Sequence, residues 1–501
     1  MTDYDDLDAT ALAARIRSGD ATAVEAMDAA LDRVAARNPI VGAFPHVEPR
    51  AQARRIARAT PPGPFGGVPY PVKDLAHPVA GMPMRSGSAA LRDVVPDTDA
   101  EMVTRMRAAG LALFAKTATP EFGLMGITEP EAHGPTRNPW APGRSPGGSS
   151  GGAAAAVAAR IVPAADASDG GGSIRIPAGF CGLFGLKPGR GRVSDGPDHG
   201  EPWHGATASL AVTHSVRDSA ALLDALCGPA PGDPVALPRP DVPFLDAVGQ
   251  DPGRLRIGFT TASPLGTAVD PECVRAVEDA AARLDRLGHH VEEASPDIDG
   301  RAVAVGYLTM YFGQVAAVIR RVEAALGRAA VGRMELTTRF LGAVGEGLSA
   351  GRYVELLLGW NDVSRAFGRF HQTYDLYLTP TAAALAPPIG AQAPTAAERA
   401  LMQTALATRT AGALLKTKWV EQIVDERLGA TPFTQQANLA GLPAMSVPLY
   451  HTAPMPGASR GLPVGVHFIG RPHQEALLLR LAAQLEADAP WTDRRPELAA
   501  V

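Results

Sequence analysis

The first regular pattern along the chain lies in residues 8–37, where apolar side chains recur at helical spacing. A Ser-Gly-Asp run at 18–20 interrupts this pattern, and the second half of it stops before the Asn-Pro pair at 38–39. Two consecutive amphipathic helices are therefore predicted. We interpret residues 1–60 as a helical N-terminal cap on the rest of the molecule.

Short apolar runs alternate with helical patterns over the remainder of the chain. One helix begins at Asp270 and Pro271, the residue types favoured at a helix start, and ends at Gly288. It lies between a predicted strand at 255–259 and another that begins at 290–292, so this segment predicts a strand–helix–strand crossover and parallel pairing. Further strands are predicted at 67–72, 111–117, 161–165, 376–379, 442–449 and 464–469, and further helices at 99–109, 153–159 and 475–485.

Strands and helices alternate from end to end, which is typical of one large α/β domain, here residues 1–501. The segment 228–243 is rich in proline, which forbids a regular helix or a central strand. We expect it to cross the surface between two lobes. Residues 300–430 are mostly helical in pattern and form a variable region in which we expect substrate-selective residues.

Composition narrows the class of protein. Of 501 residues, 46% are hydrophobic and 20% charged, which allows a large core and excludes wholesale disorder. The formal net charge of −5 provides no basic surplus for nucleic-acid binding. The sequence has no run of 18 apolar residues, so it predicts no membrane span. The acidic N-terminus does not resemble a signal peptide. We therefore expect a cytoplasmic protein that binds neither nucleic acid nor membrane.

The metal-binding side chains are sparse and unpatterned. Cys181, Cys227 and Cys273 stand far apart, which argues against a disulfide framework or a zinc site and for buried thiols. His289 and His290 are adjacent and cannot easily face one metal from a strand. We expect neither a metal nor another cofactor.

Candidate chemistry lies in two clusters of glycine and serine. The first, at 145–152, fits the loose nucleophile-elbow pattern G-x-S-x-G, but the proline-containing stretch before it cannot be the strand that such an elbow requires. The second, at 169–177, places three consecutive glycines before Ser173. Consecutive glycines turn backbone N–H groups toward one point, and beside a nucleophilic serine such a nest is an oxyanion hole.

With the segments 67–74, 185–188 and 462–466, these clusters resemble the amidase signature family. The 24-residue separation of Ser149 and Ser173 suits that family as well. The resemblance spans most of the chain and is weakest in residues 300–430. It implies an α/β fold with a large mixed twisted sheet that helices flank on both faces.

The resemblance also implies a catalytic triad in which Ser173 is the nucleophile, Ser149 the bridging serine after a cis peptide, and Lys73 the base. It assigns the oxyanion N–H groups to Gly170, Gly171, Gly172 and Ser173 itself. The family has threonine where this chain has Gly170, a change that keeps the backbone donor. The roles are chemically coherent because a serine hydroxyl needs a base, and a neutral lysine can serve.

Periodicity alone leaves two other lysines open as the base. The chain has 42 arginines and only five lysines, so Lys116 and Lys187 are also candidates for a role that needs a nitrogen able to lose its proton. Ser150 likewise competes with Ser149 for the bridging role. We expect Asp169 and Arg175 to hold the nucleophile loop, the alternative being an ordinary surface ion pair.

Within the family, the segments 128–132, 134–140, 216–218 and 490–491 resemble the 6-aminohexanoate cyclic-dimer hydrolases. Where those enzymes are expected to have a cysteine, this chain has Tyr311. Carbamates, aryl or alkyl amides and small esters therefore remain alternative substrates. Met125, Trp203 and Tyr311 are the candidate substrate-binding residues, with core packing as the alternative role for each.

Two other functions and one assembly are compatible with these motifs. The chain can be the amidase subunit of a glutamine-dependent amidotransferase, which passes ammonia to a partner. It can also be a binding protein without activity, although all three triad candidates are present. The compatible assembly is a homodimer.

The expected reaction is hydrolysis of an amide C–N bond through an acyl-enzyme.

Overall fold

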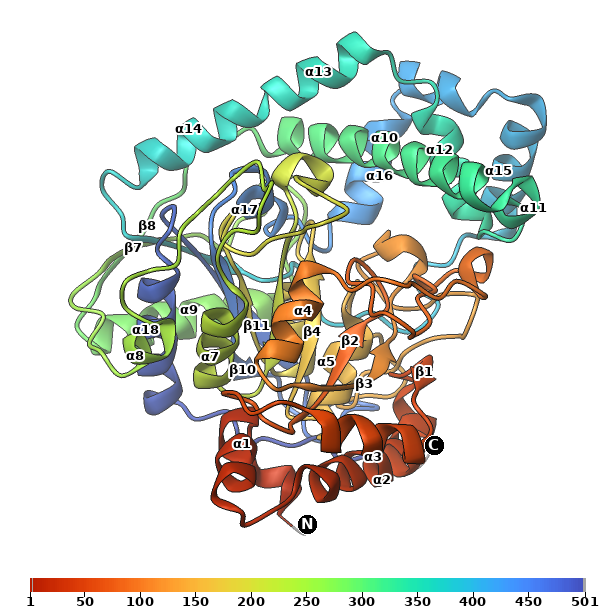
Figure 1. Ribbon diagram of the computed structural model, residues 1–501. Coiled ribbons are helices and arrows are strands. Elements are labelled where there is room, and N and C mark those ends of the chain that lie inside the picture. Colours follow the sequence, from red (N-terminus) through yellow and green to blue (C-terminus); the bar gives the residue numbers. More distant parts are fainter. Residues whose placement is uncertain (2, 499–501) are drawn as a thin grey trace.

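The centre of the molecule is a mixed eight-stranded sheet, seen in a computed structural model that describes residues 1 and 3–498 (Figure 1). Its first six strands pair antiparallel, and its last three pair parallel. The strand order is β4 (Ala164–Asp169), β6 (Ala208–Thr213), β5 (Phe184–Lys187), β10 (Ala444–His451), β11 (Pro463–Gly470), β9 (Leu376–Pro380), β7 (Arg256–Phe259) and β8 (His290–Glu293).

The predicted crossover forms the parallel edge of this sheet. Strands β7 and β8 pair in parallel and are joined by α9 (Pro271–Arg286), with Pro271 at its first position. The Asp270 carboxylate accepts the backbone N–H of Glu272, which satisfies one of the helix's free donors. The prediction of a strand, a capped helix and a parallel strand is confirmed.

Helices cover both faces of the sheet, as the alternation of side chains along β10 requires. Met445 and Val447 face the core beneath α9, α7 (Val216–Leu226) and α18 (Glu475–Asp488). Ala444 packs on the opposite face with residues of α14 (Trp360–Phe370). The fold is therefore the α/β type with a large mixed sheet that was expected.

A second, three-stranded sheet lies beside the first. It consists of β1 (His46–Val47), β3 (Ala112–Thr117) and β2 (Pro69–Lys73), in that order. The helix α5 (Gly151–Ala158) packs against both this sheet and β4, and all eight of its residues are buried. Its small side chains permit the two sheets to approach, and its N-terminus carries the first glycine–serine cluster.

The N-terminal helices differ from the prediction at one end. They are α1 (Ala9–Ser18), α2 (Ala23–Val41) and α3 (Arg50–Ala59), and α2 continues through Asn38 and Pro39 instead of stopping before them. Pro39 has no N–H to bond the carbonyl of Ala35, and the helix ends within one turn of it, at Gly42 in the left-handed conformation. The Asn38 side chain accepts the N–H groups of Ala43 and Phe44 beyond that end.

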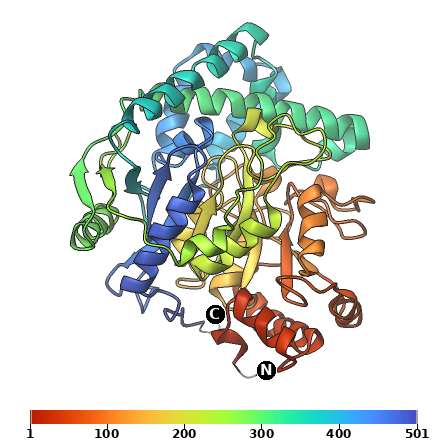
Figure 2. The same ribbon diagram turned by 60° about the vertical axis from the view of Figure 1, so that its left-hand side comes forward.

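The helices of residues 300–430 form a layer at the end of the molecule opposite the N-terminal helices, while β9 in the same range belongs to the central sheet (Figures 1 and 2). The longest helix in the layer is α10 (Gly300–Leu326). Of the helices in the described part of the chain, it alone is long and apolar enough to cross a membrane, but 56% of its most apolar stretch is buried within the protein. The others are α11 (Arg328–Val331), α12 (Leu336–Gly345), α13 (Ala350–Leu358), α14, α15 (Ala396–Thr408) and α16 (Trp419–Ile423).

The other helices are short and connect the strands of the two sheets. The segment 229–243 contains neither helix nor strand and is mostly exposed. Strands β5 and β6 were not predicted, because Phe184–Lys187 is short and Ala208–Thr213 consists mainly of small residues. The helices not yet named are α4 (Glu101–Ala108), α6 (Arg175–Cys181), α8 (Phe244–Val248) and α17 (Gln435–Leu439).

Candidate active site

Lys73 is the last residue of β2, and its side chain is fully buried. Its Nζ donates to the hydroxyl of Ser149 at 2.8 Å and to that of Ser168 at 3.0 Å. Burial lowers the pKa of this amine to about 7, although the nearby carboxylates of Asp166 and Asp169 offset part of the shift. A large neutral fraction of Lys73 is thus available near neutral pH.

Ser149 and Ser150 lie side by side at the N-terminus of α5 but face different groups. The peptide bond between Gly148 and Ser149 is cis. The Ser149 hydroxyl accepts from Lys73, whereas the Ser150 hydroxyl donates to the backbone oxygen of Ser168 at 3.2 Å. Of these two serines, Ser149 alone meets the lysine amine.

The other two candidate lysines are also buried but contact backbone. Lys116 Nζ donates to the carbonyl oxygens of His77 at 2.9 Å and Lys73 at 3.4 Å. Lys187 Nζ donates to the carbonyl oxygen of Pro188 at 2.7 Å. Burial lowers the pKa of Lys116 to about 8 and that of Lys187 to about 7. Their pKa values therefore do not separate the three lysines, but their partners do.

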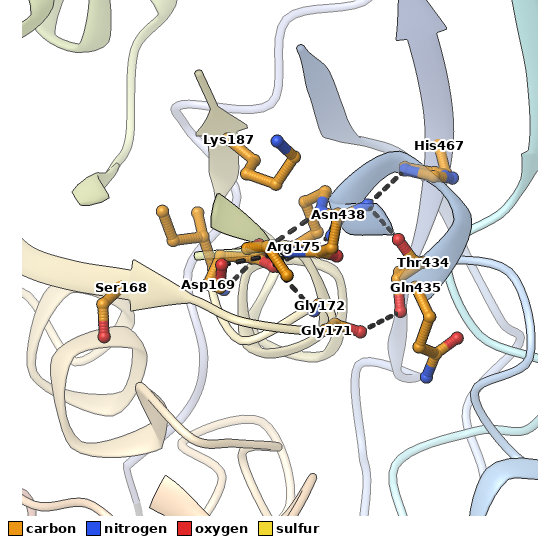
Figure 3. Close-up of polar contacts among 12 residues, drawn as sticks. Ser168, Asp169, Gly171, Gly172, Arg175, Lys187, Thr434, Gln435, Asn438 and His467 are labelled. Atoms are coloured by element: carbon orange, nitrogen blue, oxygen red, sulfur yellow. Dashed lines mark hydrogen bonds and ion pairs between the residues drawn. The ribbon is translucent and has the colours of Figure 1, made fainter. Parts of the chain in front are cut away.

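The glycine loop after β4 is held by a buried ion pair rather than a surface one (Figure 3). The Arg175 guanidinium donates to both carboxylate oxygens of Asp169, at 2.9 and 3.0 Å, and neither side chain is exposed. Burial alone would raise the pKa of Asp169, but the charge and hydrogen bonds of Arg175, together with Lys187 and Asn438, outweigh it and hold this pKa well below its usual value. Arg175 also donates to the carbonyl oxygen of Thr434 and to the side chain of Asn438.

This network occupies one of the four N–H groups assigned to the oxyanion hole. The Gly172 N–H was predicted to bind the oxyanion. It donates instead to Asp169 Oδ1 at 2.7 Å, within the loop itself. The N–H groups of Gly170, Gly171 and Ser173 have no acceptor within residues 3–498. The Gly171 carbonyl accepts the Thr434 hydroxyl at 2.6 Å, which fixes the middle of the loop.

A cavity of about 780 Å³ opens in front of this loop. Ser149 and Ser173 both line it, while Lys73 lies behind Ser149. The candidate substrate-binding residues also line its wall: Met125, Trp203 and Tyr311. The cavity thus brings together residues that the sequence places far apart.

The aromatic wall explains the unusual glycine at position 170. A Cβ at Gly170 would stand 3.1 Å from ring atoms of Trp203, so the family's threonine would crowd that ring. Trp203 meets Tyr311 edge-to-face with ring centroids 5.8 Å apart, and Tyr307 completes the group. Sequence reasoning missed Tyr307; its position one helical turn before Tyr311 was the available signal.

Sequence reasoning also missed the polar residues around Lys73. Asp166 Oδ2 accepts the backbone N–H of Lys73 at 3.0 Å and the ring Nδ1 of His77 at 2.8 Å. The other ring nitrogen of His77 lies 3.1 Å from the hydroxyl of Ser209. The available signal was the spacing of Asp166 and Ser168, since residues two apart on a strand share a face.

Comparison with known proteins places this chain in a family. The amidase family model matches residues 25–479. The chain is 38% identical, over 98% of its length, to 6-aminohexanoate-cyclic-dimer hydrolase from Pseudomonas sp. (strain NK87), of which 96% is covered. The same identity and coverage hold for the enzyme of that name from Paenarthrobacter ureafaciens.

The comparison of folds leads to the same relatives as the comparison of sequences. The solved structure of 6-aminohexanoate cyclic dimer hydrolase complexed with substrate matches with a TM-score of 0.87 and 36% identity, and 99% of each chain is covered. Family match, curated relatives and fold all extend over nearly the full length. We conclude that the chain belongs to the amidase family and is a hydrolase of amide C–N bonds.

Proposed function

We propose that this amidase cleaves an aliphatic amide of the aminohexanoate type, cyclic or linear, through a Ser–cis-Ser–Lys triad and an acyl-enzyme. The observation that carries the proposal is the 2.8 Å hydrogen bond from Lys73 to Ser149, behind a cavity that Ser149 shares with Ser173. A buried lysine that hydrogen-bonds two hydroxyls and no carboxylate suits a base, because no direct ion pair holds its proton.

In the proposed acylation, the Ser173 hydroxyl gives its proton to Ser149, which passes its own to neutral Lys73. The Ser173 oxygen then attacks the substrate carbonyl carbon. The free N–H groups of Gly170, Gly171 and Ser173 stabilise the oxyanion. The C–N bond breaks as the leaving nitrogen takes the proton back from Lys73 through Ser149. Water then attacks the ester by the same proton route and releases the acid.

The substrate class rests on the relatives and on the cavity. Two relatives that are 38% identical are named for hydrolysis of the 6-aminohexanoate cyclic dimer. A cavity of about 780 Å³ has room for a substrate of that size. The hydroxyl of Tyr311 donates to the carbonyl oxygen of Leu124 at 2.5 Å, so this residue presents its ring rather than its hydroxyl to a substrate.

Covalent labelling tests the nucleophile. We expect an alkyl fluorophosphonate to form one adduct, at Ser173, and the Ser173→Ala variant to resist labelling and to lose turnover. Labelling at Ser149 or Ser150 with Ser173 untouched would contradict the assignment.

A substrate panel tests the specificity. The purified enzyme is assayed with the cyclic dimer and linear dimer of 6-aminohexanoate, an aryl amide, a carbamate and a small ester, with Ser173→Ala as the blank. We expect the highest kcat/KM for one of the two aminohexanoate amides. A higher value for the aryl amide, carbamate or ester would replace the substrate class and leave the triad intact.

A further inference from the structure

Tyr307 of α10 presents its hydroxyl to the same cavity. The residue is largely buried and lines the cavity together with Gly171 and Ser173. Its hydroxyl has no hydrogen-bond partner in the part of the chain that the structure describes. This oxygen is not fully enclosed by protein atoms, so it is accessible from the cavity. A buried tyrosine whose hydroxyl is unpaired at a cavity wall can donate a hydrogen bond to a bound ligand.

The hydroxyl lies directly against the oxyanion loop. A Cβ added to Gly171 would overlap the hydroxyl oxygen and ring of Tyr307, so residue 171 must be glycine for the two to meet. The Thr434 hydroxyl donates to the Gly171 carbonyl and so holds this residue in place. The phenol oxygen therefore lies beside Gly171 in the wall of the cavity.

The ring of Tyr307 is held in place by its neighbours. It meets Trp203 edge-to-face at a centroid distance of 6.4 Å and stacks on Tyr311 at 6.5 Å. Such packing immobilises the hydroxyl, which a preorganised donor requires. Burial, with a smaller contribution from the Asp169 charge, raises the pKa of Tyr307, so the phenol stays protonated in the range in which Lys73 works.

We propose that the Tyr307 hydroxyl is a catalytic residue that donates a hydrogen bond to the acyl oxygen of the substrate as that oxygen becomes an oxyanion. It adds a donor to a site in which Gly172 points its N–H at Asp169 instead. The phenol keeps its proton throughout; the bond from Ser173 forms and the C–N bond breaks as described above. This inference rests on the proposed function.

Tyr307→Phe removes the donor and keeps the ring. We expect kcat to fall about 100-fold with KM within about twofold, because a donor to the oxyanion acts in the transition state rather than in the bound substrate. Tyr377→Phe is the matched control: Tyr377 is a buried tyrosine of β9 that does not line the cavity, and its variant should keep full activity.

A second measurement separates catalysis from structure. An alkyl trifluoromethyl ketone forms a tetrahedral adduct with a serine nucleophile and carries the oxyanion. If the hydroxyl binds that oxygen, Tyr307→Phe weakens the inhibitor by the same factor as it lowers kcat/KM. A variant that is merely structurally damaged would have a changed thermal midpoint. Its loss of inhibitor affinity would not equal its loss of kcat/KM.

Three other outcomes would each overturn a different claim. Wild-type kcat in Tyr307→Phe, with Ser173→Ala inactive, overturns this inference and leaves the triad standing. A raised KM with unchanged kcat assigns the hydroxyl to substrate binding and overturns its role at the oxyanion. An active Ser173→Ala variant would instead remove the proposed function on which the inference depends.

Discussion

At the scale of single residues, the property that matters most is the environment of the Lys73 amine. Burial lowers its pKa to about 7, and the amine donates to the hydroxyls of Ser149 and Ser168 as well as, at 3.4 Å, to the Ser168 carbonyl oxygen. Lys116 and Lys187 are equally buried, but each donates to carbonyl oxygens that cannot relay a proton. The partner, rather than burial alone, distinguishes the lysine that can act as a base.

Lys73→Arg tests this view. Arginine keeps the charge and much of the length, but it stays protonated because its pKa exceeds about 12. We expect the variant to fold, to keep its thermal midpoint within a few degrees, and to lose nearly all turnover. Exposed Lys418 provides the control, since Lys418→Arg should be fully active. An active Lys73→Arg enzyme would make Lys73 an electrostatic anchor and leave the base to another residue.

The pH dependence gives a second test at this scale. The base must be neutral, so kcat/KM should rise with pH through about 7 and level off above it. The Asp166 charge favours protonated Lys73 and therefore raises its pKa. Asp166→Asn removes that charge, so the neutral amine persists to lower pH and the acid limb should move to lower pH.

The profile is measured between about pH 5 and 9, with exposed Asp285→Asn as the control that leaves the limb in place. An acid limb that moves to higher pH in Asp166→Asn would contradict the sign of this electrostatic effect. An unchanged limb would mean that Lys73 does not set it.

At the scale of elements, the loop between β4 and α6 takes its shape from groups far along the chain. Arg175 at the start of α6 pairs with Asp169 at the end of β4, and it also contacts Thr434, Asn438 and His467 (Figure 3). Asp169 in turn accepts the N–H groups of two residues of the loop. The loop geometry thus depends on β11 and α17 as well as on its own glycines.

Arg175→Met should destabilise the protein and abolish activity together. It leaves the Asp169 carboxylate buried without its partner, which costs about 3–5 kcal/mol of unfolding free energy. Adding Asp169→Asn removes the stranded charge, so the double variant should recover part of the stability but no turnover. Urea unfolding and a turnover assay measure the two effects; full activity in Arg175→Met would exclude a role in shaping the loop.

At the scale of the whole molecule, the cavity lies where three distant segments meet. The glycine loop after β4, the α10 helix and the start of α17 contribute Gly171, Tyr307 and Gln435 to its wall. The small sheet brings Lys73 from behind. These parts belong to one chain, and together they hold every residue that the proposed reaction uses.

The purified chain alone should therefore hydrolyse amides with normal saturation kinetics and release one amine and one acid per turnover. An amidotransferase subunit would instead need a partner to accept ammonia. Assay of the isolated protein with simple amides, by amine and acid release, decides between the two. No turnover until a partner protein is added would favour the amidotransferase.

Activity should also survive prolonged treatment with EDTA, because each proposed step uses side chains and backbone N–H groups of this chain. Turnover before and after dialysis against the chelator is the measurement, with a zinc peptidase as the positive control for chelation. Loss of activity that zinc restores would contradict the triad.

Local sequence was sufficient for the features that depend on neighbours in the chain. The capped α9 helix follows from Asp270 and Pro271, and the strands beside it were predicted at 255–259 and from 290 on, because caps and periodicity act over a few residues. The glycine nest before Ser173 is local in the same sense. Family motifs, rather than physics, then indicated Lys73 among three candidate lysines.

Tertiary structure decided the features that depend on contacts between distant segments. Ser149 rather than Ser150 meets Lys73, the Gly172 N–H turns to Asp169, and the Tyr307 hydroxyl meets the loop. Each outcome depends on where a side chain ends in space, to within a hydrogen bond's length. Periodicity records which face a residue lies on, but the packing of two sheets and a helical layer determines what that face meets.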